Sequence, residues 1–240
     1  MKIAMFSSKS YDRKFFNKIN ADFDFEIQYL DNRLDKNTTK LAEGYDVVCV
    51  FVNDKLDREV IAQLAKNGIK LIALRAAGFN NVDLEAADRQ RIKVVRVPAY
   101  SPNAVAEHAV GLILTLNRKI HKAYNRVREG NFSLERLTGF DMKGKTVGVV
   151  GTGNIGRIFC QIVMGFGCRV IAYDKYPSDE CRERGIEYVE LNELFNKSDI
   201  ISLHCPLTPE TCHLIDSKAI EKMKDGVMLI NTSRGKLINH

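Results

Sequence analysis

The sequence lacks several features that mark particular classes of protein. No segment approaches the roughly 18 consecutive apolar residues that a membrane helix needs, and the apolar start of the chain is too short for a signal peptide. The six cysteines include no C-x-x-C pair. Lysines and arginines are scattered among acidic residues, so the net charge of +6 forms no basic run. These absences argue against a membrane protein, a disulfide framework and a nucleic-acid-binding surface.

The composition is that of a globular protein. With 240 residues and 45% hydrophobic content, the chain can bury one large core or two ordinary ones. The cysteines stand mostly within apolar patterns, so we expect them to be reduced core residues. We therefore expect a soluble, cytoplasmic protein with no membrane or nucleic-acid partner and no metal site.

A glycine-rich turn between a strand and a helix is the most specific local feature. The β-branched apolar run Thr146–Val150 leads into Gly151, Gly153 and Gly156, which have the G-x-G-x-x-G spacing. Such glycines allow a tight turn, a close approach of the backbone to a pyrophosphate and close packing of the helix on the sheet. The helix expected to begin near Asn154 would direct its free N–H groups at the phosphates. The pattern predicts a dinucleotide site, with a plain structural turn as the alternative.

An acidic residue follows the next predicted strand at the expected distance. Asp174 lies 23 residues after Gly151, against about 20 for the carboxylate that binds the adenosine ribose in such folds. Its charge would repel a 2′-phosphate, which favours NAD over NADP, although Lys175 beside it would soften this discrimination.

The chain before this turn predicts a separate domain. Short apolar runs alternate there with amphipathic stretches, which is typical of a parallel sheet covered by helices. None of these runs ends in a glycine fingerprint, so this half should not hold the dinucleotide. We predict an α/β protein with two doubly wound parallel-sheet domains. The strands expected in the first are Ile3–Phe6, Phe25–Leu30, Val47–Phe51, Lys70–Leu74 and Val94–Val97.

Two polar segments at strand ends could bind a small carboxylate. In the loop Arg75–Asp83, exposed backbone N–H groups beside Arg75 could do so. The alternative is that the loop only turns the chain and that Asp83 caps the next helix. Arg234 follows a later buried strand whose end should open on the same cleft as the glycine turn, so its guanidinium could bind a carboxylate bidentately. A salt bridge to a neighbouring acid is the alternative for Arg234.

A long helix is predicted between the two domains. Ser101 stands at the N-cap position and Pro102 at the first helical position. The apolar face continues past Leu116, and a more polar helix should extend to about Glu129. For His108, within this apolar pattern, we favour a hydrogen-bonded interior histidine over a catalytic role.

Taken in order, these motifs resemble those of the D-isomer-specific 2-hydroxyacid dehydrogenases. The tyrosine-bearing segment is most similar to that of the fermentative D-lactate dehydrogenases. The resemblance spans the whole chain, and the motifs that carry it are Arg75–Asp83, Tyr100–Ala109, Gly151–Arg157, His204–Thr211 and Asn231–Gly235.

The resemblance implies roles for individual residues. Arg234 would bind and polarise a 2-oxo acid, and the other residues implied for the substrate are Arg75, Ala76, Ala77, Gly78 and Tyr100. Thr211 stands where the family commonly has an amide, which weakens its assignment to the cofactor. The residues implied for NAD are Gly151, Gly153, Asn154, Ile155, Gly156, Asp174, Cys205, Pro206, Thr211, Thr232, Ser233 and Arg234.

The resemblance further implies a substrate domain over residues 1–99, a hinge helix region over 100–130 and a Rossmann NAD-binding domain over 131–240. The first domain would be flavodoxin-like. The family's catalytic Glu and general-acid His lie beyond the Asn231–Gly235 motif and have no counterpart here, since His240 is too close to Arg234. We therefore expect the Rossmann domain to lack its C-terminal part, and residues 1–240 alone to be inactive.

The function implied for the intact protein is the reduction of pyruvate to D-lactate by NADH, within a homodimer. A reductase of glyoxylate, hydroxypyruvate or another 2-oxo acid is the alternative within the enzyme class. A dinucleotide-sensing binding protein, similar to the transcriptional corepressors that resemble this family, is the alternative outside it.

Overall fold

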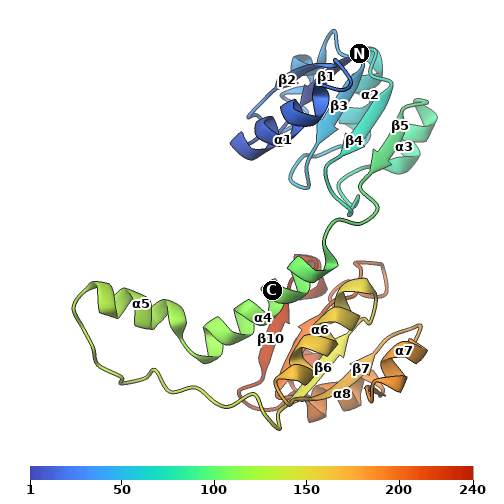
Figure 1. Cartoon of the computed structure of the whole chain (residues 1–240). Coiled ribbons are helices and arrows are strands. Elements are labelled where there is room, and N and C mark those ends of the chain that lie inside the picture. Colours follow the sequence, from blue (N-terminus) through green and yellow to red (C-terminus); the bar gives the residue numbers. More distant parts are fainter. Residues whose placement is uncertain (240) are drawn as a thin grey trace. The chain divides into compact units, whose positions relative to one another are not determined.

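The computed structural model describes residues 1–239, so His240, set aside above as a catalytic candidate, lies outside the described residues. The chain forms two compact units, Met1–Tyr100 and Ser101–His240, and each contains a five-stranded sheet (Figure 1). All strand pairs in both sheets are parallel, and the predicted α/β class with two doubly wound sheets is confirmed. Within the described part, no helix combines the length and the apolar character needed to cross a bilayer.

The first unit has the strand order β2-β1-β3-β4-β5, the order of flavodoxin-like folds. All of the strands predicted for this half are present, each within a few residues of its expected bounds. The strands are β1 (Lys2–Met5), β2 (Glu26–Tyr29), β3 (Val47–Val50), β4 (Leu71–Leu74) and β5 (Lys93–Arg96). The helices are α1 (Ser10–Asn20), η1 (Thr39–Ala42), α2 (Arg58–Lys66) and α3 (Leu84–Arg89).

Local sequence signals explain how the helices of this unit begin. The carboxylate of Asp57 accepts the N–H of Val60 at 3.1 Å and starts α2, and Asp83 accepts the N–H of Ala86 at 2.9 Å and starts α3. Helix α2 then buries Val60, Ile61 and Leu64 against the sheet, as its periodicity predicts.

The second unit has the order β10-β9-β6-β7-β8, in which β6 is central as in dinucleotide-binding folds. Its strands are β6 (Thr146–Val150), β7 (Arg169–Tyr173), β8 (Glu187–Tyr188), β9 (Ile200–Leu203) and β10 (Met228–Asn231). Its helices are α4 (Pro102–Asn117), α5 (Ile120–Arg128), α6 (Asn154–Gly165), α7 (Asp179–Glu183), α8 (Leu191–Lys197), α9 (Ser217–Ile220) and η2 (Gly235–Leu237).

Both faces of this second sheet are buried, which explains the continuous apolar runs of its strands. Val149 packs into a cluster with α4 and α6, whereas its neighbour Val150 packs on the opposite face with α8 and α9. Figure 1 shows α4 beside α6 over the first of these faces. Because the strands are parallel, the carboxyl ends of β6, β7, β9 and β10 meet along one edge, where ligands bind in such sheets.

The helix predicted to run to about Glu129 is interrupted. Ser101 Oγ accepts the N–H of Ala104 at 3.3 Å and Pro102 opens α4 as expected, but Lys119 adopts a left-handed conformation with φ 52° and separates α4 from α5. Asn117, the last residue of α4, exchanges hydrogen bonds of 2.8 Å with both backbone groups of Phe140. Residues 118–139 thus form an arm that is fixed at its base by Asn117.

Candidate active site

The glycine turn after β6 has the geometry expected of a pyrophosphate cradle. Gly151 has φ 95°, and a Cβ placed on it would lie 2.7 Å from the backbone nitrogen of Cys205. A Cβ on Gly156 would overlap the carbonyl oxygen of Gly151, so α6 packs directly on the turn. A Cβ on Gly153 would meet nothing within 4 Å. The first and third glycines are therefore required by the fold itself, while the second faces open space.

The start of α6 supplies free hydrogen-bond donors at this open space. Gly153 is the N-cap residue and offers no side-chain acceptor. In residues 1–239, the N–H groups of Gly153, Asn154 and Ile155 have no protein acceptor. Unpaired N–H groups at the positive end of a 12-residue helix fit an anionic pyrophosphate.

Asp174 lies next to the turn, at the end of β7. The N–H of Gly151 donates to the carbonyl of Tyr173 at 2.9 Å, which joins the ends of β6 and β7. One Asp174 oxygen, Oδ2, accepts the N–H of Thr152 at 2.5 Å and its hydroxyl at 3.0 Å. The other oxygen, Oδ1, accepts the N–H of Tyr176 at 2.9 Å. The predicted ribose-binding carboxylate is thus held at the mouth of the turn.

The segment after β9 closes the opposite side of the turn. Cys205 is buried, and burial raises the pKa of its thiol to about 11, so the thiol stays protonated and unreactive at neutral pH. The Thr211 hydroxyl donates to the carbonyl of Pro206 at 2.6 Å and accepts the N–H of Thr208 at 2.8 Å. Thr211 therefore uses its hydroxyl to shape its own loop.

His204 packs against α6, the helix that follows the glycine turn. Its ring packs on Phe159 of α6 with centroids 4.7 Å apart, and its Nε2 lies 2.9 Å from Ser202 Oγ. Nδ1 is buried and has no partner among the described residues. Burial lowers the pKa of His204 to about 4, so the ring is neutral at physiological pH.

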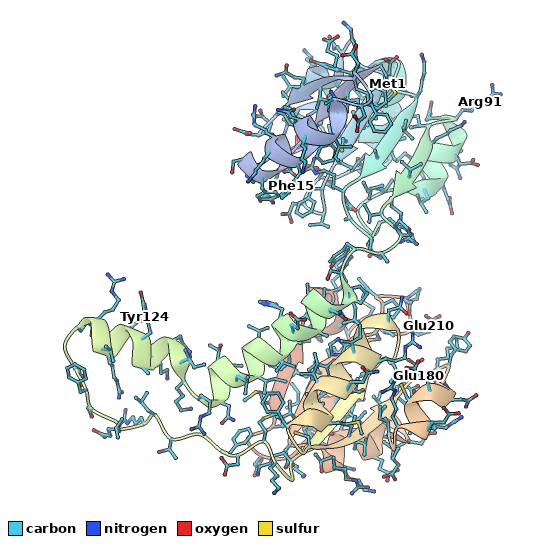
Figure 2. All side chains as sticks on the ribbon, in the orientation of Figure 1. Met1, Phe15, Arg91, Tyr124, Glu180 and Glu210 are labelled. Carbon is cyan, nitrogen blue, oxygen red and sulfur yellow. The ribbon has the colours of Figure 1, made fainter. Side chains whose placement is uncertain are left out.

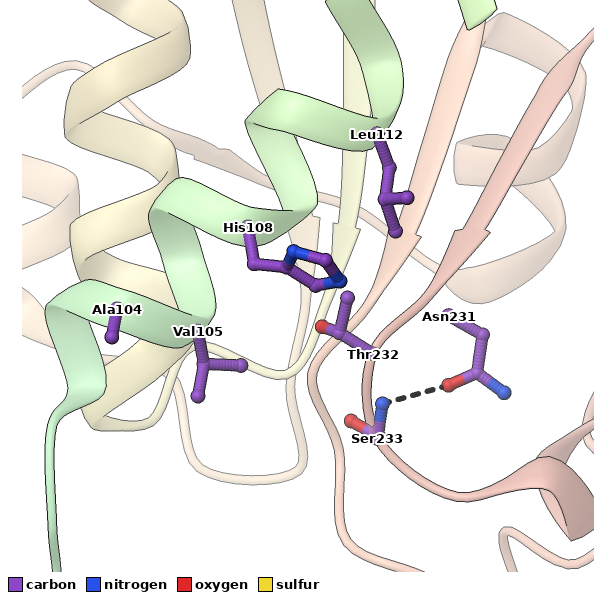
Figure 3. Close-up of a pocket in the computed structure, with 7 residues that line it drawn as sticks. All are labelled: Ala104, Val105, His108, Leu112, Asn231, Thr232 and Ser233. Carbon is purple, nitrogen blue, oxygen red and sulfur yellow. Dashed lines mark hydrogen bonds between the residues drawn. The ribbon is translucent and has the colours of Figure 1, made fainter. Parts of the chain in front are cut away.

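A cavity of about 450 Å³ lies between α4 and the end of β10 (Figure 3). Thr232 Oγ1 is buried in the structure with no hydrogen-bond partner in the described chain, so it can bind an additional polar group. Ser233 donates its N–H to Asn231 Oδ1 at 2.9 Å, which fixes the chain as it leaves the strand. The cavity is lined by Ala104, Val105, His108, Leu112, Asn231, Thr232 and Ser233.

The interpretation of His108 as an interior histidine is wrong. His108 is exposed and has no hydrogen bond among the described residues, and its ring points toward Thr232 in Figure 3. The reason is that α4 buries one stripe of residues, and His108 lies beside that stripe. The buried residues of α4 are Ala106, Ala109, Val110, Ile113 and Asn117.

Arg234 directly follows Ser233, one of the residues that line this cavity, and is half-buried. Its Nη1 donates to the carbonyl of Ser233 at 3.2 Å, and Asn231 Nδ2 donates to the Arg234 carbonyl at 2.9 Å. No carboxylate in residues 1–239 forms a salt bridge with Arg234. The salt-bridge alternative raised by the sequence is therefore not observed, and the guanidinium can bind a carboxylate ligand.

The loop after β4 in the first unit presents a row of backbone donors. Within the described chain, the N–H groups of Ala76, Ala77 and Gly78 donate to no protein acceptor. Arg96 Nη1 donates to the Ala77 carbonyl at 2.8 Å and its guanidinium lies over the ring of Phe79, so the loop is held from one side. Successive free N–H groups of this kind can bind an anion.

The guanidinium of Arg75 is already occupied within its own unit. It donates to the carbonyls of Phe6 and Ser7 at 3.1 and 3.2 Å and lies 3.6 Å from Asp12. Its side chain is only 9% exposed. Tyr100, the last residue of this unit, is 67% exposed and makes no side-chain hydrogen bond in the part of the chain that the structure describes.

Comparisons with known proteins show the family of this chain. Residues 110–240 match the model of the D-isomer specific 2-hydroxyacid dehydrogenase, NAD binding domain. The D-lactate dehydrogenase of Escherichia coli strain K12 is 57% identical over 239 residues, which cover 100% of this chain and 73% of that protein. The chain belongs to the D-isomer-specific 2-hydroxyacid dehydrogenase family. The family assignment predicted from the motifs is confirmed, as is NAD as the cofactor.

Solved structures of the same family have the same fold. The apo structure of the Escherichia coli D-lactate dehydrogenase is 56% identical with a TM-score of 0.93, and the match covers 100% of this chain and 76% of that one. The Aquifex aeolicus D-lactate dehydrogenase complexed with NAD and lactic acid is 36% identical with a TM-score of 0.86. That match covers 99% of this chain and 70% of the other.

His204, whose ring nitrogen Nδ1 is buried next to the glycine turn, predicts a pH-dependent stability. The unfolded chain binds a proton at the ordinary histidine pKa, near 6.5, while the folded chain binds it only near 4. The contribution of the neutral His204 ring to the free energy of unfolding is therefore fully present above about pH 6.5 and is lost as the pH falls toward 4. The free energy of unfolding should decrease by about 2 kcal/mol between pH 7 and pH 5 for this reason.

Urea unfolding of the parent and of His204→Gln at pH 7 and pH 5 measures the contribution of His204 to the free energy of unfolding. The glutamine variant should lose less stability than the parent on going to pH 5, by about 2 kcal/mol. His121→Gln, on the exposed surface of α5, should behave like the parent. Equal pH dependence of the parent and His204→Gln would contradict the assignment.

Proposed function

We propose that this protein is a D-lactate dehydrogenase that reduces pyruvate with NADH. The observation that carries the proposal is Arg234, a guanidinium with no carboxylate partner among the described residues, on the same sheet edge as the glycine turn. Relatives matched over the whole chain are named D-lactate dehydrogenase or, in Chlamydomonas reinhardtii, pyruvate reductase, and these names support pyruvate as the substrate. A fermentative role in the cytoplasm belongs to the same proposal.

The second unit would position the cofactor and one end of the substrate. The turn from Gly151 to Ile155 would bind the pyrophosphate, Asp174 the adenosine ribose, and the buried Thr232 hydroxyl a polar group of the nicotinamide end. Bound NADH would supply a hydride to C2 of the substrate, and a general acid would have to protonate the carbonyl oxygen to give the hydroxyl group of D-lactate. Arg234 would bind the 2-oxo acid and polarise its carbonyl. Cys205 and Pro206 would line the cofactor site on the side of β9.

In the first unit, the loop after β4 would hold the substrate carboxylate. The free N–H groups of Ala76, Ala77 and Gly78 are the proposed donors. Arg75 would act on this loop by tying the end of β4 to the carbonyls of Phe6 and Ser7. Tyr100 remains proposed as a lining residue of the substrate site.

A substrate screen tests the proposal. In an enzyme with the full length of the relatives, kcat/KM should be highest for pyruvate among pyruvate, glyoxylate, hydroxypyruvate and larger 2-oxo acids. A maximum at glyoxylate or hydroxypyruvate would make the protein a different reductase of this family. Tight NADH binding without turnover of any 2-oxo acid would make it a dinucleotide-sensing binding protein.

We also propose that the protein is a homodimer that pairs through the arm of residues 118–139. Helix α5 has no buried residue, and Figure 2 shows Tyr124 on it, away from the sheet of its unit. Phe132 and Leu134, in the same arm, are 76% and 80% exposed. Several large exposed apolar side chains in one arm favour a protein interface, and a second copy could cover them.

Sedimentation analysis of the double variant Phe132→Ser and Leu134→Ser tests this interface. Two large side chains contribute about 3–6 kcal/mol when buried, so the dimer dissociation constant should rise by about 100-fold or more. Tyr176→Ser, an equally exposed site outside the arm, is the matched control. A double variant that dimerises as tightly as the parent would exclude the arm.

A further inference from the structure

A chain of hydrogen bonds joins the edge of the second sheet to Asp174. The N–H of Ser178 donates to Tyr188 Oη at 2.9 Å, and Tyr188 Oη lies 2.8 Å from Thr152 Oγ1. Thr152 Oγ1 lies 3.0 Å from Asp174 Oδ2. Tyr188 stands on the edge strand β8, and Thr152, the second residue of the glycine motif, is only 4% exposed.

The donors and acceptors of this chain allow only one direction when Asp174 is ionised. A carboxylate can only accept, so Thr152 must donate its single hydroxyl proton to Asp174. Thr152 can then only accept from Tyr188, whose oxygen is free to accept the backbone N–H of Ser178. Each hydroxyl therefore donates once and accepts once, and the chain ends on the carboxylate.

This arrangement fixes one oxygen of Asp174 and leaves the other accessible to a ligand. Oδ2 accepts both donors of Thr152, while Oδ1 accepts only the N–H of Tyr176 and retains capacity for another donor. A carboxylate held in this way cannot rotate away from an incoming 2′-phosphate. It would keep its repulsion for NADPH and its hydrogen-bonding position for the ribose of NADH.

We propose that Tyr188 and Thr152 are positioning residues that set the preference for NAD over NADP. They act through Asp174, so the inference rests on the ribose-binding role of Asp174 in the proposed function. Without these two hydroxyls, only the backbone N–H groups of Thr152 and Tyr176 would hold Asp174. The carboxylate would then turn more easily, and the exposed Lys175 next to it could bind the 2′-phosphate.

Titration of the whole protein with NADH and with NADPH tests the inference. Thr152→Val keeps the shape of the side chain but removes the hydroxyl, and it should lower the ratio of NADPH to NADH dissociation constants by about five- to tenfold. Tyr188→Phe should lower this ratio in the same direction by a smaller factor. Thr152→Ser restores the hydroxyl and should restore the ratio.

Two further variants separate the possible outcomes. Asp174→Ala should lower the ratio more than either substitution, and if it does not, the proposed ribose-binding role is wrong. If Asp174→Ala lowers the ratio while Thr152→Val and Tyr188→Phe do not, the positioning inference is wrong and the proposed role of Asp174 stands. Equal weakening of NADH and NADPH would show a merely structural role and also overturn it. Thr146→Val, at the other end of β6, should change neither constant.

Discussion

Replacing Arg234 with lysine is expected to lower kcat/KM for pyruvate by about two orders of magnitude or more. The guanidinium offers two parallel N–H donors to a carboxylate or to the pair of oxygens of a 2-oxo acid, whereas an ammonium is a point charge without this fork. No acid in residues 1–239 pairs with Arg234, so the loss should come from the substrate and leave the folded state unchanged.

Steady-state kinetics in an enzyme with the relatives' full length would measure this effect. Arg184→Lys, which alters an exposed arginine paired with Glu180, serves as the matched control and should leave kcat/KM within about twofold of the parent. NADH affinity should also stay near the parental value for Arg234→Lys. If Arg234→Lys retains kcat/KM within a few-fold of the parent, Arg234 has a structural role and another residue must bind the substrate.

The parts of the site that the sequence predicts are those fixed by backbone geometry. The spacing of Gly151, Gly153 and Gly156 after a β-branched strand specifies a turn that few other residues could form, and Asp174 follows at the end of the adjacent strand. Parallel strands bring their carboxyl ends to one edge whatever their side chains, so the motifs after β9 and β10 could be placed there too.

Side-chain destinations were harder to predict because they depend on tertiary neighbours. Arg75 follows a strand end just as Arg234 does, yet its guanidinium is taken by the carbonyls of Phe6 and Ser7, which are about 70 residues earlier in the chain. Tyr188 lies on a strand of two residues that carries no periodicity, so its link to Thr152 has no signal in the sequence. His108 shares the apolar pattern of α4 but lies outside its buried stripe.

The three glycines of the turn should respond differently to the same added methyl group. Gly156→Ala would place its Cβ against the carbonyl oxygen of Gly151, and relieving this overlap requires the turn or α6 to move. We expect the free energy of unfolding to fall by about 1–3 kcal/mol, after the smaller gain in helix propensity that alanine brings. NADH binding should weaken as well, because the donors at the start of α6 shift with the helix.

Gly153→Ala should separate binding from folding. Its Cβ would meet no protein atom within 4 Å, and its φ of −66° suits alanine, so stability should stay within about 0.5 kcal/mol of the parent. The methyl group would instead occupy the space proposed for the pyrophosphate, and NADH affinity should fall by roughly 100-fold, or about 2–3 kcal/mol.

Urea unfolding and NADH fluorescence titration of the two variants test both statements. Gly111→Ala is the matched control, because it lies on the exposed side of α4 with nothing within 4 Å and should neither lower stability nor weaken binding. If Gly153→Ala binds NADH as tightly as the parent, the pyrophosphate does not approach the second glycine. The open space at Gly153 would then be only a feature of the surface, and the cradle would have to be sought at another part of the turn.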